Sequence, residues 1–212
     1  MIINKTKGLI AAPFTGMDLD GKINVKNVSS YADHLKKIGV KGVFVAGTTG
    51  EGMLMTDSER LEVIEAWISQ KSDNFRIIAH AGSTSITSAK LLASESARLG
   101  AEAIAIMGPP FFATKGVNEL VDFSKDVALS APELPFYYYH IPALSRVDFP
   151  MSEYLNEAKS KIPNLAGIKF TDNNFMEMSK CLSMDNGKWD ILHGYDELLL
   201  AGLSFGAVGA VG

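Results

Sequence analysis

The sequence predicts an α/β protein of the TIM, or (β/α)8, barrel class, and two observations support this prediction. Eight short apolar runs of β-type residues recur along the chain, and segments with helical periodicity separate them. Alternation of this kind requires a parallel sheet, and eight units favour a closed barrel over an open doubly wound sheet. The expected strands lie near 8–13, 42–46, 76–80, 102–107, 135–139, 165–170, 189–193 and 207–211.

The helical segments between these runs have apolar residues at spacings of three and four. In segment 25–38, for example, Val28, Tyr31 and Leu35 share one face. Either Thr56 or Asp57 is expected to cap the helix predicted next. The remaining predicted helices are 57–70, 87–99, 117–129, 151–160, 174–182 and 197–205.

Length and composition favour one globular domain, residues 1–212, whose partners are small molecules or proteins. Hydrophobic residues make up 47% of the 212 positions, which is enough for a sizeable core. The net charge is −4, and no cluster of lysine and arginine is large enough to indicate binding to nucleic acid or to an anionic membrane. No segment reaches the 18 or so apolar residues of a membrane span.

The cysteine and histidine residues indicate the cellular compartment and argue against a metal site. The single Cys181 cannot form an internal disulfide, which favours a reducing, cytoplasmic compartment. The four histidines show no metal-ligand spacing, and we therefore expect no metal; a serine-hydrolase Gly-x-Ser-x-Gly elbow is also absent. These histidines are His34, His80, His140 and His193.

The residue with the clearest chemical potential is Lys169, which follows small and apolar residues near the end of the run 165–170. In a barrel this lysine would point inward, where a dry environment favours the neutral amine. A neutral amine can attack a ketone and form a Schiff base. The alternative is a lysine at a strand end that reaches solvent or pairs with a carboxylate.

A tyrosine-rich run, Phe136-Tyr137-Tyr138-Tyr139-His140, precedes a proline and also ends in polar groups. A phenol beside an imine-forming lysine can transfer a proton to and from a substrate hydroxyl. Strand alternation places Tyr137 and Tyr139 on one face and Tyr138 on the other. The alternative is that all three are packing aromatics.

The third constellation is the loop Gly47-Thr48-Thr49-Gly50-Glu51-Gly52, which follows the apolar run 42–46. Backbone N–H groups of a glycine-rich loop, with two threonine hydroxyls, suit a small carboxylate such as that of pyruvate. The loop lacks the Lys-Ser/Thr ending of a P-loop. Alone, it could equally be a turn.

Together these motifs resemble the family of N-acetylneuraminate lyase and dihydrodipicolinate synthase, which are pyruvate-dependent, Schiff-base-forming lyases on a TIM barrel. The likeness runs from Leu9 to Gly212 and rests on Gly47-Thr48-Thr49-Gly50-Glu51, Tyr139-His140-Ile141-Pro142 and Gly167-Ile168-Lys169. The resemblance implies that Lys169 forms the imine and that Tyr139 transfers the proton. It further implies that Thr48 bonds this phenol and that Thr48 and Thr49 hold the carboxylate.

The likeness favours the lyase branch over the synthase branch. Leu144 stands where the synthases place an arginine for a second carboxylate, so a dicarboxylate substrate would lose its partner. The segment Gly194-Tyr195-Asp196-Glu197 resembles the part of the lyases that contacts the polyhydroxy tail of sialic acid. We therefore expect Gly194, Asp196, Glu197 and Thr171 to bind substrate, although the two acids could instead be an acidic pair at a helix N-terminus.

The implied activity is cleavage of N-acetylneuraminate to N-acetylmannosamine and pyruvate, with no cofactor and with a homotetramer as the family precedent. Two alternatives remain open. The chain could be a pyruvate-forming aldolase for a 2-keto-3-deoxy sugar acid or a 4-hydroxy-2-oxo acid, or it could be a noncatalytic sialic-acid binder or subunit partner. The family continues beyond the position of Gly212 with an eighth helix and a C-terminal helical extension. The sequence therefore predicts a C-terminally truncated barrel with uncovered apolar surface.

Overall fold

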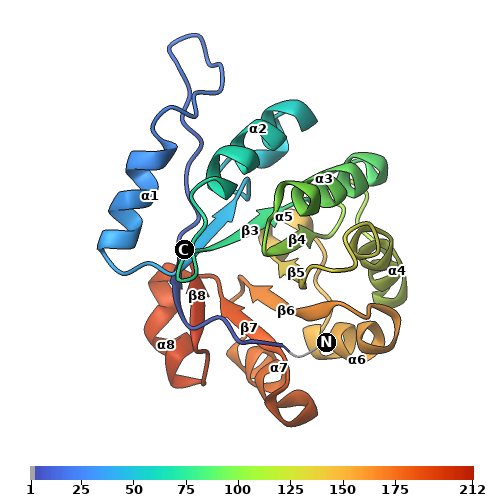
Figure 1. Cartoon of the computed structure of the whole chain (residues 1–212). Coiled ribbons are helices and arrows are strands. Elements are labelled where there is room, and N and C mark those ends of the chain that lie inside the picture. Colours follow the sequence, from blue (N-terminus) through green and yellow to red (C-terminus); the bar gives the residue numbers. More distant parts are fainter. Residues whose placement is uncertain (1–2) are drawn as a thin grey trace.

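The computed structural model describes residues 3–212, which form eight parallel strands surrounded by helices (Figure 1). The strands follow one another in the order β1-β8-β7-β6-β5-β4-β3-β2, and every pairing is parallel. Their bounds are β1 Gly8–Ile10, β2 Gly42–Val45, β3 Arg76–His80, β4 Ala103–Met107, β5 Phe136–His140, β6 Leu165–Phe170, β7 Asp190–His193 and β8 Gly209–Val211.

The two outer strands of this order meet and nearly close the sheet into a barrel. The Ala11 N–H donates to the Gly42 carbonyl at 2.9 Å, and the Phe44 N–H donates to the Ala11 carbonyl at 2.8 Å. A parallel bridge between Ala11 and Val43 joins the ends of β1 and β2. The predicted TIM-barrel class is therefore confirmed.

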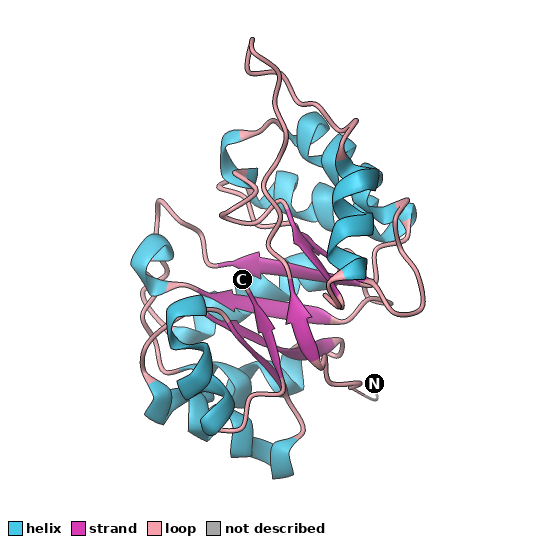
Figure 2. Ribbon diagram, turned by 90° about the vertical axis from the view of Figure 1, so that its left-hand side faces the viewer, coloured by secondary structure: helices cyan, strands magenta, loops and turns pink. Residues whose placement is uncertain are grey.

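The helices lie outside the strands, as Figure 2 shows from the side. Thr56 caps α2 by accepting from the Glu59 N–H, and the Glu59 carboxylate accepts from the Thr56 N–H; the predicted cap is therefore confirmed as a capping box. The helices are α1 Val28–Lys37, α2 Asp57–Ile68, α3 Ile86–Leu99, α4 Val117–Ala128, α5 Pro142–Ser145, α6 Met151–Lys161, α7 Phe175–Gly187 and α8 Leu199–Ser204, with 3-10 turns η1 Gly52–Leu54 and η2 Asp196–Leu198.

Three predicted helix boundaries were wrong. Helix α1 begins at Val28 instead of residue 25, because the chain before it forms a protruding loop that Met17 and Ile23 bridge (Figure 1). Segment 197–205 is divided between η2 and α8. Helix α7 runs past residue 182, with non-helical backbone at 184–186, where two residues have positive φ.

Apolar side chains divide into an inner and an outer layer. The barrel interior contains Phe44, Ile78 and Tyr139, whereas Tyr138 points outward and packs on Tyr154 of α6 with ring centroids 4.6 Å apart. The predicted alternation of the three tyrosines is therefore confirmed, since Tyr137 also lies in the interior cluster.

A buried polar cluster closes the amino-terminal end of the barrel. The Tyr137 hydroxyl donates to Asp190 Oδ2 at 2.8 Å, and the Thr6 N–H donates to the same oxygen at 2.9 Å. Arg76 Nη1 donates to Thr6 Oγ1 at 2.6 Å and lies 3.4 Å from the Tyr137 hydroxyl oxygen. These groups fill the end of the barrel opposite Lys169 and leave the carboxyl ends of the strands as the open face.

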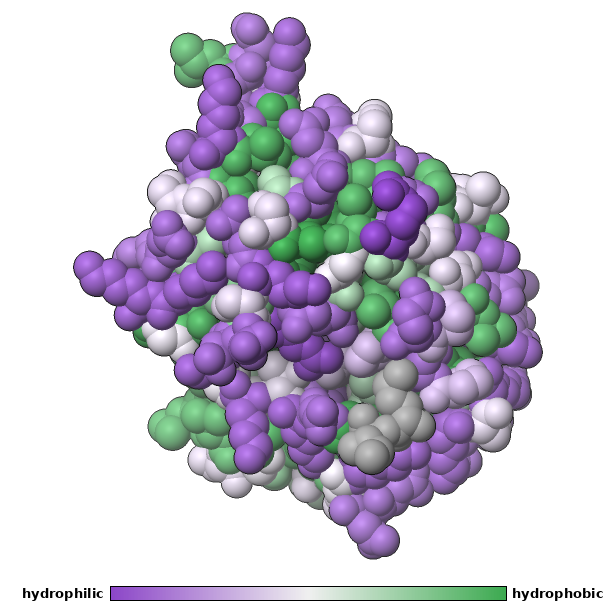
Figure 3. Space-filling view, viewed as in Figure 1, coloured by the Kyte–Doolittle hydropathy of each residue, from purple (hydrophilic) through white to green (hydrophobic). Residues whose placement is uncertain are grey.

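Apolar side chains remain exposed near the last and first strands. Leu200 is 81% exposed, and Leu9, Leu203, Phe205 and Val208 are between 43% and 51% exposed. On the face drawn in Figure 3, hydrophobic side chains lie between mostly hydrophilic ones. Within residues 3–212, no helix is long and apolar enough to cross a membrane.

Candidate active site

Lys169 projects into the barrel from β6, where it is 4% exposed. Its Nζ atom lies 4.3 Å from the ring centroid of Phe44 on β2 and 4.1 Å from that of Tyr139 on β5. Aromatic faces attract a cation, but they provide no hydrogen-bond acceptor strong enough to replace water. The lysine is therefore positioned in a dry aromatic environment, as its sequence context predicted.

Burial in this environment lowers the pKa of Lys169 to about 7, and the nearby charge of Asp196 opposes that shift. Its ordinary pKa is about 10.4, at which a negligible fraction of the amine is neutral at physiological pH. With the lowered pKa, a substantial fraction carries a free electron pair. The barrel thus prepares this amine for attack on a carbonyl group.

Tyr139 and Thr48 lie beside the lysine. Thr48 Oγ1 is 3.3 Å from the Tyr139 hydroxyl oxygen, so the loop after β2 and the end of β5 meet at this pair. Burial raises the pKa of Tyr139, and the hydrogen bond to Thr48 opposes that rise. The phenol therefore keeps its proton at neutral pH and is available as a donor near the amine.

The loop after β2 is held in an unusual backbone conformation. Ala46 and Glu51 have φ angles of 54° and 55°, which lie in the left-handed region that side chains disfavour. The Gly52 N–H donates to the Gly47 carbonyl at 3.0 Å, and this bond closes the turn. The turn leaves Thr48 exposed at the mouth of the barrel beside its neighbour Thr49, where a carboxylate could reach both hydroxyls.

The ends of β6 and β7 approach each other closely at Thr171 and Gly194. A Cβ atom on Gly194 would lie within bonding distance of the Thr171 hydroxyl oxygen, so only glycine fits there. Thr171 is 5% exposed, and its hydroxyl lies close enough to the Tyr139 phenol to oppose the rise in the pKa of that phenol, as Thr48 does. Asp196 and Glu197 follow on η2 and are exposed beside this strand end. All four therefore lie at the carboxyl ends of β6 and β7.

An apolar cavity of about 550 Å³ adjoins Thr48 at the mouth. Leu144 from α5 contributes to its wall and is 49% exposed. The wall offers no cation for a second carboxylate, which agrees with the expectation that a dicarboxylate substrate is disfavoured. The other lining residues are Glu51, Gly52, Met53, Leu54, Thr84, Met107, Pro110 and Phe111.

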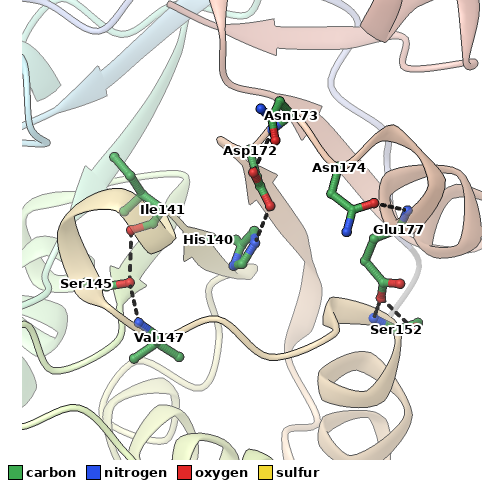
Figure 4. Close-up of polar contacts among 9 residues, drawn as sticks. All are labelled: His140, Ile141, Ser145, Val147, Ser152, Asp172, Asn173, Asn174 and Glu177. Atoms are coloured by element: carbon green, nitrogen blue, oxygen red, sulfur yellow. Dashed lines mark hydrogen bonds and ion pairs between the residues drawn. The ribbon is translucent and has the colours of Figure 1, made fainter.

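Behind the site, polar contacts connect the loops that follow β5 and β6 (Figure 4). His140 Nε2 lies 3.6 Å from Asp172 Oδ2; burial lowers the pKa of His140, and the Asp172 charge opposes that shift. Asp148 lies near this pair, with one potential ligand atom of each of the three within 4.8 Å of the others. Local spacing could not reveal this cluster, because the fold brings its members together.

Two further elements of this loop region fix its shape (Figure 4). Ser145 Oγ donates to the Ile141 carbonyl at 2.9 Å and accepts from the Val147 N–H at 3.2 Å, which holds the turn at α5. On α7, Glu177 accepts from both the N–H and the hydroxyl of Ser152, at 2.8 and 2.7 Å. These contacts restrain the backbone that carries Tyr139 and Thr171 without involving their side chains.

Sequence reasoning missed three side chains around the lysine. Phe44 provides one of its flanking rings, His80 from β3 packs against both Phe44 and Tyr139, and Arg60 from α2 contacts His80. Alternation could have indicated that His80 points inward with Ile78. No comparable pattern identifies Arg60, since its contact depends on how α2 packs over the strand ends.

A lysine with a lowered pKa, a hydrogen-bonded phenol and a hydroxyl-rich loop meet at the open end of a TIM barrel. This arrangement suits a lyase of the imine-forming class, whose reaction needs both an amine nucleophile and a proton donor.

The chain belongs to the dihydrodipicolinate synthetase family, whose model matches residues 5–212. It is 45% identical to N-acetylneuraminate lyase of Xenopus tropicalis over 98% of its length and 68% of that relative. Proteus mirabilis N-acetylneuraminate lyase superposes with a TM-score of 0.96 at 40% identity, over 99% of this chain and 70% of that one. A Ruminococcus gnavus sialic acid aldolase described as a catalytic lysine mutant superposes at 0.91 with 27% identity, over 97% of this chain and 67% of that one. The chain spans 66% to 68% of the length of its most similar curated relatives.

The lowered pKa of Lys169 predicts the pH dependence of imine formation. Only the neutral amine attacks a ketone, so the initial rate of reductive trapping of pyruvate should rise with pH through about 7 and level off above it. Below that pKa the rate should fall about tenfold for each pH unit. Cyanoborohydride trapping followed by mass spectrometry from pH 5 to pH 10 measures this profile. A rate that still rises between pH 9 and 10 would show that burial does not lower the pKa.

Proposed function

We propose that this chain cleaves N-acetylneuraminate to N-acetylmannosamine and pyruvate through an imine on Lys169. The observation that carries the proposal is the buried lysine amine, with its pKa near 7, beside the Tyr139 phenol and Thr48. The relatives named N-acetylneuraminate lyase support the choice of substrate. This chain is 45% and 40% identical to two of these relatives over 98% and 99% of its length, which is why their substrate is proposed for it.

In the proposed reaction the neutral amine of Lys169 attacks the C2 ketone of the open-chain sugar, and loss of water gives a protonated imine. The Tyr139 oxygen then accepts the proton of the C4 hydroxyl as the phenol passes its own proton to the substrate carboxylate, while the C3–C4 bond breaks. The electron pair of that bond moves into the imine and forms an enamine, and the C4 oxygen becomes the aldehyde of the released sugar. Protonation at C3 and hydrolysis by water release pyruvate and restore the amine.

The neighbouring groups match the polar groups of this substrate. The hydroxyls of Thr48 and Thr49 would bind the carboxylate, and the Thr171 hydroxyl near the Tyr139 phenol can contact the same substrate. Asp196 and Glu197 can accept hydrogen bonds from the polyhydroxy tail, and Gly194 leaves room for the substrate to pass close to the backbone. The binding roles of all these residues are part of the proposal.

Reductive trapping tests the function directly. With pyruvate and borohydride, the chain should gain the mass of a reduced pyruvyl group on Lys169, and it should release pyruvate from N-acetylneuraminate. Lys169→Arg should abolish both, because guanidinium remains protonated, and Lys169→Met should behave alike. Absence of trapping in a well-folded chain would instead favour a noncatalytic sialic-acid binder.

Replacing the Tyr139 phenol should separate imine formation from bond cleavage. Tyr139→Phe keeps the ring that flanks Lys169 but removes the proton carrier, so pyruvate trapping should persist while cleavage slows by roughly 10² to 10⁴. Steady-state turnover and trapping yield are measured on the same preparation. Normal turnover of the phenylalanine variant would make Tyr139 a packing residue only.

Substrate choice should depend on the acidic pair of η2. Asp196→Ala or Glu197→Ala should cost about 1 to 3 kcal/mol in kcat/KM with N-acetylneuraminate, the range for one lost hydrogen-bond partner. The loss should be much smaller with a short 4-hydroxy-2-oxo acid, which has no tail. Equal losses on both substrates would indicate a folding defect, and no loss on either would favour a simpler keto acid as substrate.

We also propose that the chain forms a homo-oligomer. Large apolar side chains are exposed around the barrel mouth, among them Leu54, Phe111 and Phe112, which are 77% to 82% exposed. Such a patch favours contact with a second protein surface, and the family precedent is a tetramer. Sedimentation velocity at several concentrations tests this, and a monomer at all of them would contradict it.

For the cellular location we propose the cytoplasm. Burial raises the pKa of the single Cys181 to about 12, so the thiol stays protonated and unreactive, as is usual for a packed thiol in a reducing compartment. Subcellular fractionation tests the location, and recovery outside the cytoplasm would contradict it.

A further inference from the structure

Arg60 on α2 is a buried charge without a carboxylate partner. Its side chain is 2% exposed, and none of the ion pairs among residues 3–212 includes it. Its Nη1 donates to the Gly82 carbonyl at 2.7 Å and its Nη2 to the His80 carbonyl at 2.5 Å. Burial lowers the pKa of Arg60 only to about 10, so the guanidinium is charged at neutral pH. A buried charge held by carbonyls alone is costly and calls for a function.

The contacts of Arg60 lead to His80, the last residue of β3. Arg60 Nη2 lies 3.4 Å from His80 Nδ1, and that nitrogen lies 3.2 Å from the Ala46 carbonyl oxygen. Among residues 3–212 the buried His80 Nε2 atom has no hydrogen-bond partner, and a Cβ on Gly82 would lie 2.8 Å from it. The imidazole is therefore enclosed by its neighbours and cannot turn without displacing them.

The His80 ring completes an aromatic group beneath the lysine. Its centroid lies 5.8 Å from that of Tyr139, at an interplanar angle of 88°, and 5.8 Å from that of Phe44. The Phe44 and Tyr139 centroids are themselves 5.4 Å apart. These are the two rings that flank the Lys169 amine, so His80 supports both from below.

We propose that Arg60 and His80 are positioning residues of the imine site: the buried guanidinium holds the end of β3 and the neutral His80 ring, and this ring fixes Tyr139 beside Lys169. The inference rests on the proposed function and deepens it. Neither residue is assigned contact with substrate. They affect the reaction indirectly, because they pack the Tyr139 phenol in place and keep the His80 imidazole neutral.

The charges around His80 explain why its neutral form matters. Burial is the largest cause that holds the pKa of His80 well below its ordinary value, and the cations Arg60, from α2, and Lys169, from β6, lower it further. The Tyr139 phenol on β5 keeps its proton and therefore adds no charge beside His80. The hydrogen bond to the Ala46 carbonyl, just after β2, opposes the lowering of the His80 pKa. An imidazolium here would place an added positive charge close to the protonated imine and oppose its formation.

The test removes the arginine charge and follows the histidine. In Arg60→Met the pKa of His80 should rise relative to the parent, because one of the two cations that lower it is gone while burial and Lys169 remain; histidine C–H resonances in NMR follow this rise without any turnover. Turnover should then acquire an added acid limb, so that the ratio of rates at pH 8 and pH 5.5 rises relative to the parent. Arg60→Lys keeps a cation and should show no added limb.

Two controls separate this effect from loss of structure. Arg98→Met removes an exposed arginine of α3 and should leave both the NMR titration and the pH profile unchanged. His80→Gln in the Arg60→Met background provides an amide that cannot titrate and should abolish the added limb. His80→Gln alone should lower kcat and leave the KM for substrate within about twofold, because the phenol is displaced and the carboxylate loop is not.

A folded Arg60→Met chain with the parental pH profile and an unchanged His80 pKa would overturn the proposal. If the Arg60→Met chain does not fold, the His80→Gln chain provides the test. A kcat equal to that of the parent would then show that His80 does not position Tyr139. Failure of the proposed function looks different, because the unaltered chain would then trap no pyruvate. In that case the NMR titration of His80 still tests the control of its charge by Arg60.

Discussion

Keeping a primary amine out of water is the constraint on which the candidate site depends. Lys169 lies between two aromatic faces that attract its cation weakly and cannot solvate it as water does. An isolated strand or helix could not exclude water from a lysine in this way. A ring of eight parallel strands can, because side chains from β2, β3 and β5 surround the one from β6.

Neighbouring positions on the strands have different tasks because their side chains alternate. Tyr139 and Lys169 face the barrel interior, whereas His140 faces outward and pairs with Asp172 behind them (Figure 4). The outward-facing His140 connects the loops after β5 and β6 through Asp172. The inward-facing Tyr139 and Lys169 remain available to react with a substrate. A shift of one residue in strand register would exchange these tasks, which explains why packing on both faces of the sheet must specify the register.

Much of the fold could be predicted from sequence, because buried parallel strands are continuous apolar runs and the helices between them are amphipathic. The lysine, the tyrosine alternation and the threonine loop were also accessible, since each lies at the end of such a run. The start of α1, the break at 184–186 and the short helix α5 were not, because left-handed residues and turns leave weak local signals. Arg60 and the cluster around His140 depend on contacts between distant elements, which no local pattern encodes.

The polar cluster at the amino-terminal end of the barrel bears on the direction from which a substrate reaches Lys169 and on the order in which products leave. Tyr137, Asp190, Thr6 and Arg76 bond to one another below the lysine, whereas Thr48 and Tyr139 lie above it at the carboxyl ends of the strands. A substrate joined to Lys169 by its ketone end would have its tail toward the carboxyl ends of the strands. In the proposed reaction the sugar would leave first, because after bond cleavage only the three-carbon part stays covalently bound to the lysine. The keto acid would leave last, once water has hydrolysed the imine.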